Sequence, residues 1–148
     1  MANRLSTLVV LASFGTATGV VSGEAVDYLS QIKPILAEKC YACHGALKQQ
    51  AELRLETRAL MLTGGDSGQA IVPGNANESR LIERITASDE ERMPPASESV
   101  ALTTDEITLI RKWIDQGAEA SDEPVPAGPR DHWAFQKPFR PDVPRIEH

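Results

Sequence analysis

Apolar residues recur every three or four positions along the middle of the chain, a spacing that is typical of amphipathic helices. The first such segment runs from Val26 to Lys39. Its predicted apolar face consists of Val26, Leu29, Ile32, Ile35 and Leu36. Pro34 interrupts the pattern, and proline is tolerated in the first turn of a helix but not in its interior. We therefore expect a kink or a break there, with Pro34 as the first residue of a short second helix.

Two further helices are predicted between residues 53 and 85. Leu53 to Leu62 is expected to be helical in part, with Thr57 as a plausible N-cap and Gly64 in the stop signal. A turn is expected at 71–74. The next helix opens near Asn77 and runs to about Ile85, with Leu81, Ile82 and Ile85 facing inward.

The last predicted helix has the clearest boundaries. Thr103 followed three residues later by Glu106 forms a capping-box pattern, and Gly117 is placed to end the helix. Its expected buried stripe is Ile107, Ile110, Trp113 and Ile114. The preceding stretch, Thr86 to Leu102, is predicted to be a loop because it contains two consecutive prolines. No segment reads convincingly as a strand, so the sequence predicts an all-α protein of about four short helices.

The two ends of the chain differ from this helical part. Residues 1–23 hold a single charge, Arg4, followed by a short apolar run and small residues up to Gly23. This order is typical of a signal peptide cleaved after Gly23, and an uncleaved anchor is the alternative. Six of the ten prolines fall within residues 119–148. We interpret 24–118 as the folded domain and 119–148 as a Pro-rich linker or tail.

Composition narrows the possible partners. The chain has 148 residues and a formal net charge of -6, which argues against nucleic acid or an anionic membrane surface as the main partner. Only 5% of the residues are aromatic, so large core side chains are scarce. A domain of this size often needs support beyond apolar packing.

The two cysteines indicate what that support is. Cys40 and Cys43 are separated by two residues, and His44 follows directly. This spacing lets two thiols add to the vinyl groups of one haem while the imidazole ligates the iron. An exported protein is the appropriate setting, because haem of this type is attached outside the cytoplasm. The motif therefore predicts one covalently attached haem c.

Three other interpretations of the cysteines were weighed. A zinc site needs further ligands, and only His132 and His148 remain, both in the tail. A thioredoxin-like redox pair would lie between a strand and a helix, which an all-α chain does not offer. A disulfide closing so short a loop would stabilise little.

The second axial ligand of the iron is less sharply indicated. Met93 lies in the Pro-rich loop, which can present a side chain to a cofactor. Met61 lies in an apolar helical run, where ordinary core packing is the simpler interpretation. Met93 is favoured, and Met61, a histidine or an open position are the alternatives.

Several segments together resemble the planctomycete-type cytochrome c domain. They are Ile32–Leu36 running into the cysteine motif, Leu53–Leu55, Gly64–Gly68, Ile71–Gly74, Glu78–Ser79, Arg92–Pro95, and the stretch from Leu102 through Trp113 to Ala118. The resemblance implies a class I cytochrome c-like fold, in which the N- and C-terminal helices cross beside the haem. It also implies Cys40 and Cys43 as thioether sites, His44 as proximal ligand and Met93 as distal ligand.

In such proteins the module usually stands at the N-terminus of a longer multi-domain chain. The segment from Asp131 to Phe135 looks like the start of a connector to further domains that are absent here. The leading functional hypothesis is an exported one-electron carrier, periplasmic or otherwise extracytoplasmic, rather than an enzyme. It is expected to work with redox partner proteins and to have no membrane span in its mature form. The alternative is a haem redox or gas-sensing module serving a catalytic domain in cis.

The carrier hypothesis includes an apolar shell that keeps the haem dry. The shell is expected to comprise Ile32, Leu36, Leu55, Leu60, Ile82, Ile85, Ile110 and Trp113. Electrons are expected to pass through the exposed haem edge near Tyr41, Ala42 and Ala46. The acidic net charge favours a partner with a basic docking face.

Overall fold

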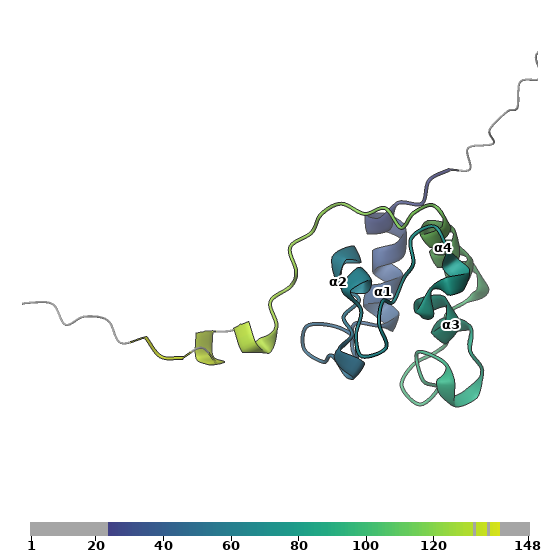
Figure 1. Ribbon diagram of the computed structural model, residues 1–148. Coiled ribbons are helices and arrows are strands. Elements are labelled where there is room, and N and C mark those ends of the chain that lie inside the picture. The colour runs from purple at the N-terminus through teal and green to yellow at the C-terminus, as the bar shows by residue number, and fades with distance from the viewer. Residues whose placement is uncertain (1–23, 132, 136, 140–148) are drawn as a thin grey trace, which may run out of the picture.

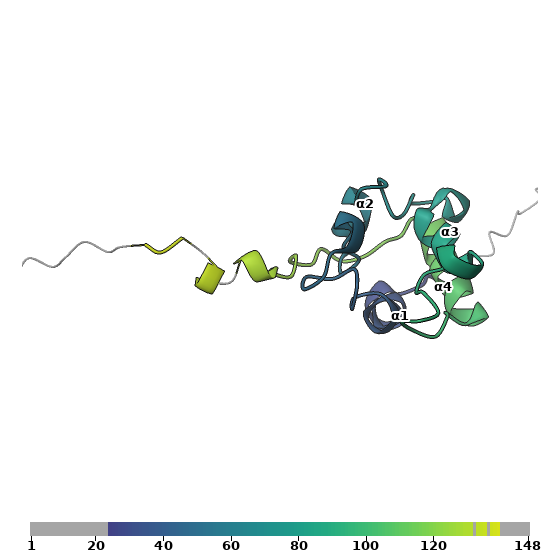
Figure 2. The ribbon, with the colours of Figure 1, turned by 90° about the horizontal axis from the view of Figure 1, so that it is seen from below.

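Four α-helices organise the computed structural model, which describes residues 24–131, 133–135 and 137–139 (Figure 1). They are α1 (Lys33–Lys39), α2 (Arg58–Thr63), α3 (Arg80–Thr86) and α4 (Thr104–Asp115). Short 3₁₀ and π turns join them, and the described residues hold two isolated β-bridges but no strand. The all-α prediction is confirmed for this part of the chain. Seen from below, α3 and α4 lie together while α2 stands apart from α4 (Figure 2).

Near Pro34, where a kink or a break is predicted, a π turn passes into an α-helix with no interruption between them. Residues Tyr28–Ile32 form this turn, and the Lys33 N–H donates to the Tyr28 carbonyl five residues back. Pro34 has no N–H to continue a regular helix across this point. Helix α1 begins at Lys33, so Pro34 is its second residue and not its first. The prediction that Leu29 is buried is wrong: it is 47% exposed, because the wide turn directs Tyr28 and Ile32 inward instead.

Helix α2 starts five residues later than the earliest predicted position. Thr57 is its N-cap, as expected, and its hydroxyl accepts a hydrogen bond from the Leu60 N–H at 3.3 Å. The residues before Thr57 are extended, because the Leu55 N–H donates to the His44 carbonyl at 2.9 Å. This contact with His44 therefore takes the place of the helical hydrogen bonds that the apolar pattern predicts.

Glycine ends α2 as the sequence indicated. Gly64 has a φ of +76°, and a Cβ there would lie 2.0 Å from the Gly68 carbonyl oxygen. No other residue fits both the backbone conformation and this close approach. Helix α3 then begins at Arg80, after a 3₁₀ turn at Ala76–Glu78 that the sequence pattern had merged with it.

The capping box at the start of α4 is confirmed. The Thr103 hydroxyl accepts from the Glu106 N–H at 3.2 Å, and the Glu106 carboxylate accepts from the Thr103 N–H at 2.7 Å. Two N–H groups that a helix start leaves unpaired are thereby satisfied. Gly117, with a φ of +102°, follows the other end of the helix.

Replacing Thr103 with alanine removes the hydroxyl half of this box. The Thr103→Ala variant is expected to lose about 1 kcal/mol of unfolding free energy, the usual value of an N-cap side chain. Urea denaturation followed by circular dichroism measures this loss. Thr108→Ala is a matched control, because the Thr108 hydroxyl only donates to the Thr104 carbonyl within the same helix. An equal loss in both variants would show that the cap contributes nothing specific.

The hydrophobic core lies where the π turn, α3 and α4 meet, and Leu36 of α1 joins it. Trp113 of α4 is 1% exposed and stacks on Tyr28, with ring centroids 5.3 Å apart. Around this pair lie the fully or almost fully buried residues Ile32, Leu36, Ile71, Ile82, Ile110 and Ile114. Leu60, which was expected in the apolar shell, is only partly buried. The described residues thus form an apolar core of their own.

The segment after α4 is extended, as its composition suggested, but it is tied to the helices. The Ala118 carbonyl accepts from Arg58 at 2.7 Å, and the Glu119 carbonyl accepts from the Trp113 indole at 2.9 Å. Farther on, Glu123 pairs with Lys33 of α1. Arg54 donates to the Pro126 carbonyl at 2.8 Å. We call residues 119–126 the strap; the chain leaves the helices only beyond it (Figures 1 and 2).

Several sequence-based predictions lie outside the described residues. These are the signal peptide at 1–23 and the two tail histidines, His132 and His148. Among the residues that the structure describes, no helix is both long and apolar enough to cross a membrane.

Candidate haem site

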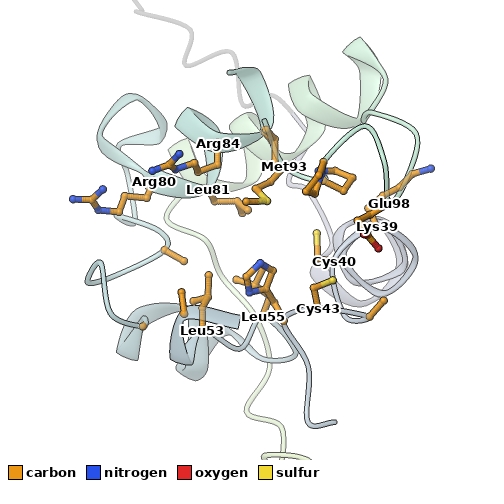
Figure 3. Close-up of a pocket in the computed structure, with 18 of the residues that line it drawn as sticks. Lys39, Cys40, Cys43, Leu53, Leu55, Arg80, Leu81, Arg84, Met93 and Glu98 are labelled. Carbon is orange, nitrogen blue, oxygen red and sulfur yellow. The ribbon is translucent and has the colours of Figure 1, made fainter. Parts of the chain in front are cut away.

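One cavity brings together all four residues proposed to hold a haem. Cys40, Cys43, His44 and Met93 all line a cavity of about 430 Å³. This volume falls within the roughly 300–1,000 Å³ of typical small-molecule and cofactor sites. Figure 3 shows the cysteines on one side, with Met93 facing Leu53 and Leu55 across the open space.

The two cysteines lie in a turn that directly follows α1. The N–H groups of Cys43 and His44 both donate to the Cys40 carbonyl, at 3.1 and 2.9 Å. Both thiols are free, Cys40 being buried and Cys43 partly so. Burial, with a smaller effect from Cys43, raises the pKa of Cys40 to about 12. Cys40 is therefore a neutral thiol at physiological pH.

His44 is held as a neutral imidazole. Burial lowers the pKa of this imidazole. Interactions with the backbone of Leu53 and Gln50 raise the pKa, and the nearby Lys48 ammonium lowers it. Its Nδ1 atom is buried and has no hydrogen-bond partner among the described residues. A buried ring nitrogen that is neither protonated to a cation nor paired is unusual in a purely structural histidine. Such a ring suits metal ligation, which requires the neutral form.

The loop after His44 is supported by a buried carboxylate. Glu56 is 8% exposed and accepts from the Ala46 N–H at 2.9 Å and from the Arg54 Nε at 2.7 Å. Its backbone carbonyl accepts from the hydroxyls of Tyr28 and Tyr41, both at 3.3 Å. We call Arg54, Glu56 and their hydrogen-bond partners the Glu56 network. The sequence pattern does not predict this network, because it favours a partly helical segment from residue 53, and residues two apart in a helix do not share a face.

Glycine at position 45 completes the support of this loop. A Cβ on Gly45 would lie 2.5 Å from the Tyr41 carbonyl oxygen, which is shorter than real Cβ contacts. The chain can therefore turn back sharply after His44 only with glycine at this position.

Met93 is placed in the cavity by a backbone contact with α3. Its N–H donates to the Arg84 carbonyl at 2.9 Å, and its side chain is 36% exposed. Met61, the alternative ligand, is fully buried in the core and is not among the residues lining the cavity. Of these two methionines, Met93 is the one whose position allows it to meet a group in the cavity.

The apolar wall of the cavity differs from the predicted shell. It includes Leu53, Leu55, Ala70, Leu81, Ile85 and Pro94. Of the eight residues expected around the haem, only Leu55 and Ile85 line the cavity, and the prediction is wrong for the other six. Helical periodicity identifies buried faces, but Ile32, Leu36 and Trp113 are buried against other helices rather than against the cavity.

These observations meet what a covalently held haem requires of its site. Two free thiols lie on one side of an apolar cavity, and a neutral imidazole and a thioether also line it. Among the described residues, no group of three or more histidine, cysteine, aspartate or glutamate side chains lies close enough to hold a metal ion. The residues present therefore fit a metal that brings its own macrocycle better than they fit a bare ion.

Comparison with known proteins gives the same indication. Residues 40–97 match the sequence profile of the family described as Planctomycete cytochrome C. The matched segment begins at Cys40 and includes His44 and Met93. It is shorter than the stretch from Ile32 to Ala118 over which the sequence resembles this family. No curated protein and no solved structure matches the chain. Residues 40–97 of this chain are therefore similar to the planctomycete cytochrome C family.

Proposed function

We propose that the protein is an exported c-type cytochrome that binds one haem covalently and transfers single electrons. The observation that carries this proposal is the single cavity lined by Cys40, Cys43, His44 and Met93. The match of residues 40–97 to a cytochrome c family supports haem binding and electron transfer as the class of function. The proposal includes a cytochrome c-like fold, with the π turn and α1 at one end of the sequence and α4 at the other beside the haem.

Each of the four residues has a defined task in this proposal. The thiols of Cys40 and Cys43 each add across one vinyl group, so that sulfur bonds to one carbon and hydrogen to the other, with no leaving group. His44 provides a nitrogen lone pair to the iron, and Met93 provides its thioether sulfur. When bound, the haem supplies an iron that alternates between the ferric and ferrous states.

The side chains around the cavity favour one oxidation state of the iron over the other. Leucine, isoleucine and proline side chains exclude water from the site, and a methionine ligand favours ferrous iron. The His44 loop is fixed by the Glu56 network, so the ligand is held in place before and after electron transfer. A site that changes little on reduction is suited to repeated one-electron exchange.

Electron exchange is proposed at the edge of the cavity beside the attachment turn. Ala42 and Lys48 are exposed there, and Leu47 is 89% exposed. The Lys48 ammonium lies 3.7 Å from the Cys43 sulfur, so this surface is adjacent to a proposed thioether site. Short-lived redox complexes bury little area, and a patch of this size is sufficient for docking. We propose a redox protein outside the cytoplasm as the partner.

The visible spectrum of the purified protein tests the ligand assignment. After export in a host with a haem-attachment system, the ferric protein is expected to show an iron–methionine charge-transfer band. Met93→Ala is expected to abolish this band, because the sulfur ligand is removed. Met61→Leu is the matched control and is expected to retain it, since Met61 packs in the core.

Two results would contradict the proposal in different ways. Wild-type protein without bound haem after such an export would exclude a c-type cytochrome. A wild-type high-spin spectrum that responds to carbon monoxide would favour the gas-sensing alternative, because an open iron position is required for it.

A further inference from the structure

We propose that Arg80 and Arg84 form the carboxylate-binding end of the cavity and pair with the two propionate groups of the haem. This inference rests on the proposed haem binding and adds a positioning and charge-balancing role for two residues of α3. Neither arginine was identified by the sequence analysis, because charged residues on a helix usually indicate a solvated face.

The two arginines share one face of α3 and border the cavity. They are four residues apart, so their side chains project from the same side of the helix. Both line the cavity, Arg80 with an exposed side chain and Arg84 with a side chain that is 42% exposed. Figure 3 shows them on one side of the cavity and Cys40 and Cys43 on the other.

The arrangement of the haem substituents matches the separation between the arginines and the cysteines. Its two vinyl groups and its two propionates lie on opposite edges of the macrocycle. If Cys40 and Cys43 hold the vinyl edge, the propionate edge must point away from them, toward the side that carries Arg80 and Arg84. A guanidinium group pairs with a carboxylate through two parallel N–H donors, which suits a propionate.

The other charged residues that line the cavity do not lie on the same side as Arg80 and Arg84. They are Glu38, Lys39 and Glu98, and Figure 3 shows Lys39 and Glu98 on the cysteine side. Glu38 pairs with Lys39 at 2.7 Å. On the outer surface, Glu91 lies 4.0 Å from Arg84, a long and exposed ion pair that leaves other guanidinium donors available. The arginine side is therefore the positively charged end of the cavity.

Pairing at this end has a consequence for the iron. Reduction removes one positive charge from the iron, so nearby negative charge favours the ferric form. Two unpaired propionates would exert this effect, and two arginines would offset it. The arginines are thus expected to raise the midpoint potential of the haem.

Potentiometric titration followed by the visible spectrum tests the inference. The Arg80→Gln/Arg84→Gln double variant is expected to bind haem covalently but to have a lower midpoint potential. The expected shift is about tenfold in the ferric-to-ferrous ratio at a given electrode potential, or about 59 mV for a one-electron couple. Arg80→Lys/Arg84→Lys is expected to recover most of this shift, because it restores the charge.

Arg111→Gln is the matched control. Arg111 lies on α4 and donates to the Asn77 side chain, and it is not among the residues lining the cavity. An equal shift in this control, an unchanged potential in the double glutamine variant, or an equal shift in the lysine variant would each overturn the inference. The two single glutamine variants, at exposed and half-buried positions, decide the matter if the double variant does not fold.

The spectrum separates this inference from the proposed function. If wild-type protein carries no haem, the proposed function fails. If haem is attached and the potentials of the glutamine variants match the wild type, only the role of the arginines fails.

Discussion

A Cys40→Ala/Cys43→Ala double variant is expected to lose all covalently bound haem. The two residues are the only cysteines in the chain, so no other thiol can form a thioether bond. Haem staining after denaturing electrophoresis measures the attachment, and intact mass confirms it. Because Ile32, Ile110 and Trp113 are buried in the core and do not line the cavity, helical circular dichroism is expected to persist in the variant.

The single variants serve as controls for the double one. Cys40→Ala and Cys43→Ala each leave one thiol, and each is expected to keep one thioether bond and a reduced amount of haem. Haem that remains attached to the double variant after denaturation would contradict the assignment of these cysteines.

Replacing Glu56 with alanine is expected to be the most destabilising change near the site. Removing the carboxylate leaves the Ala46 N–H without its partner and Arg54 without its ion pair. The side chains of Arg54 and Glu56 are only 12% and 10% exposed, and breaking such a buried pair costs about 3–5 kcal/mol. Arg54 keeps its bond to the Pro126 carbonyl, so we expect the lower end, about 3 kcal/mol.

Urea denaturation of the haem-free chain measures this change without interference from the cofactor. Glu56→Gln is the comparison, since its amide oxygen can still accept from the Ala46 N–H while the charge is lost. A loss below about 1 kcal/mol in Glu56→Ala, the value of one ordinary hydrogen bond, would show that the network does not hold the loop.

The elements that could be predicted from sequence are those with local signals. The Thr103 capping box, the Thr57 cap and the irregular helix around Pro34 each depend on residues within a few positions of one another. Leu29 was misplaced because the prediction assumed 3.6 residues per turn across a segment that forms a π turn. The start of α2 was predicted too early. The Leu55 N–H donates to the distant His44 carbonyl, and local periodicity does not indicate such a contact.

The candidate site divides in the same way. Cys40, Cys43 and His44 form a contiguous motif, and Met93 stands beside two prolines, so sequence alone indicated them as a set. The structure adds that they share one cavity, while their chemical roles stay predictions. The apolar residues that line the cavity could not be predicted, because the periodicity of a helix identifies its buried face but not the element that covers this face. Glu56 could not be predicted either, because its carboxylate accepts from the Ala46 N–H, ten residues away in the sequence.

The hydrogen bonds of the strap determine which part of the domain a pulling force on the tail reaches first. A pull on the chain beyond residue 126 would first reach the bond between Arg54 and the Pro126 carbonyl. Arg54 is paired with Glu56, and Glu56 holds Ala46, two residues after His44. Tension or docking downstream would therefore act on the loop that carries the proposed iron ligand before it reached α4. The end of the strap is thus connected to the loop after His44, so a force on the chain beyond residue 126 and the position of the proposed iron ligand would be linked.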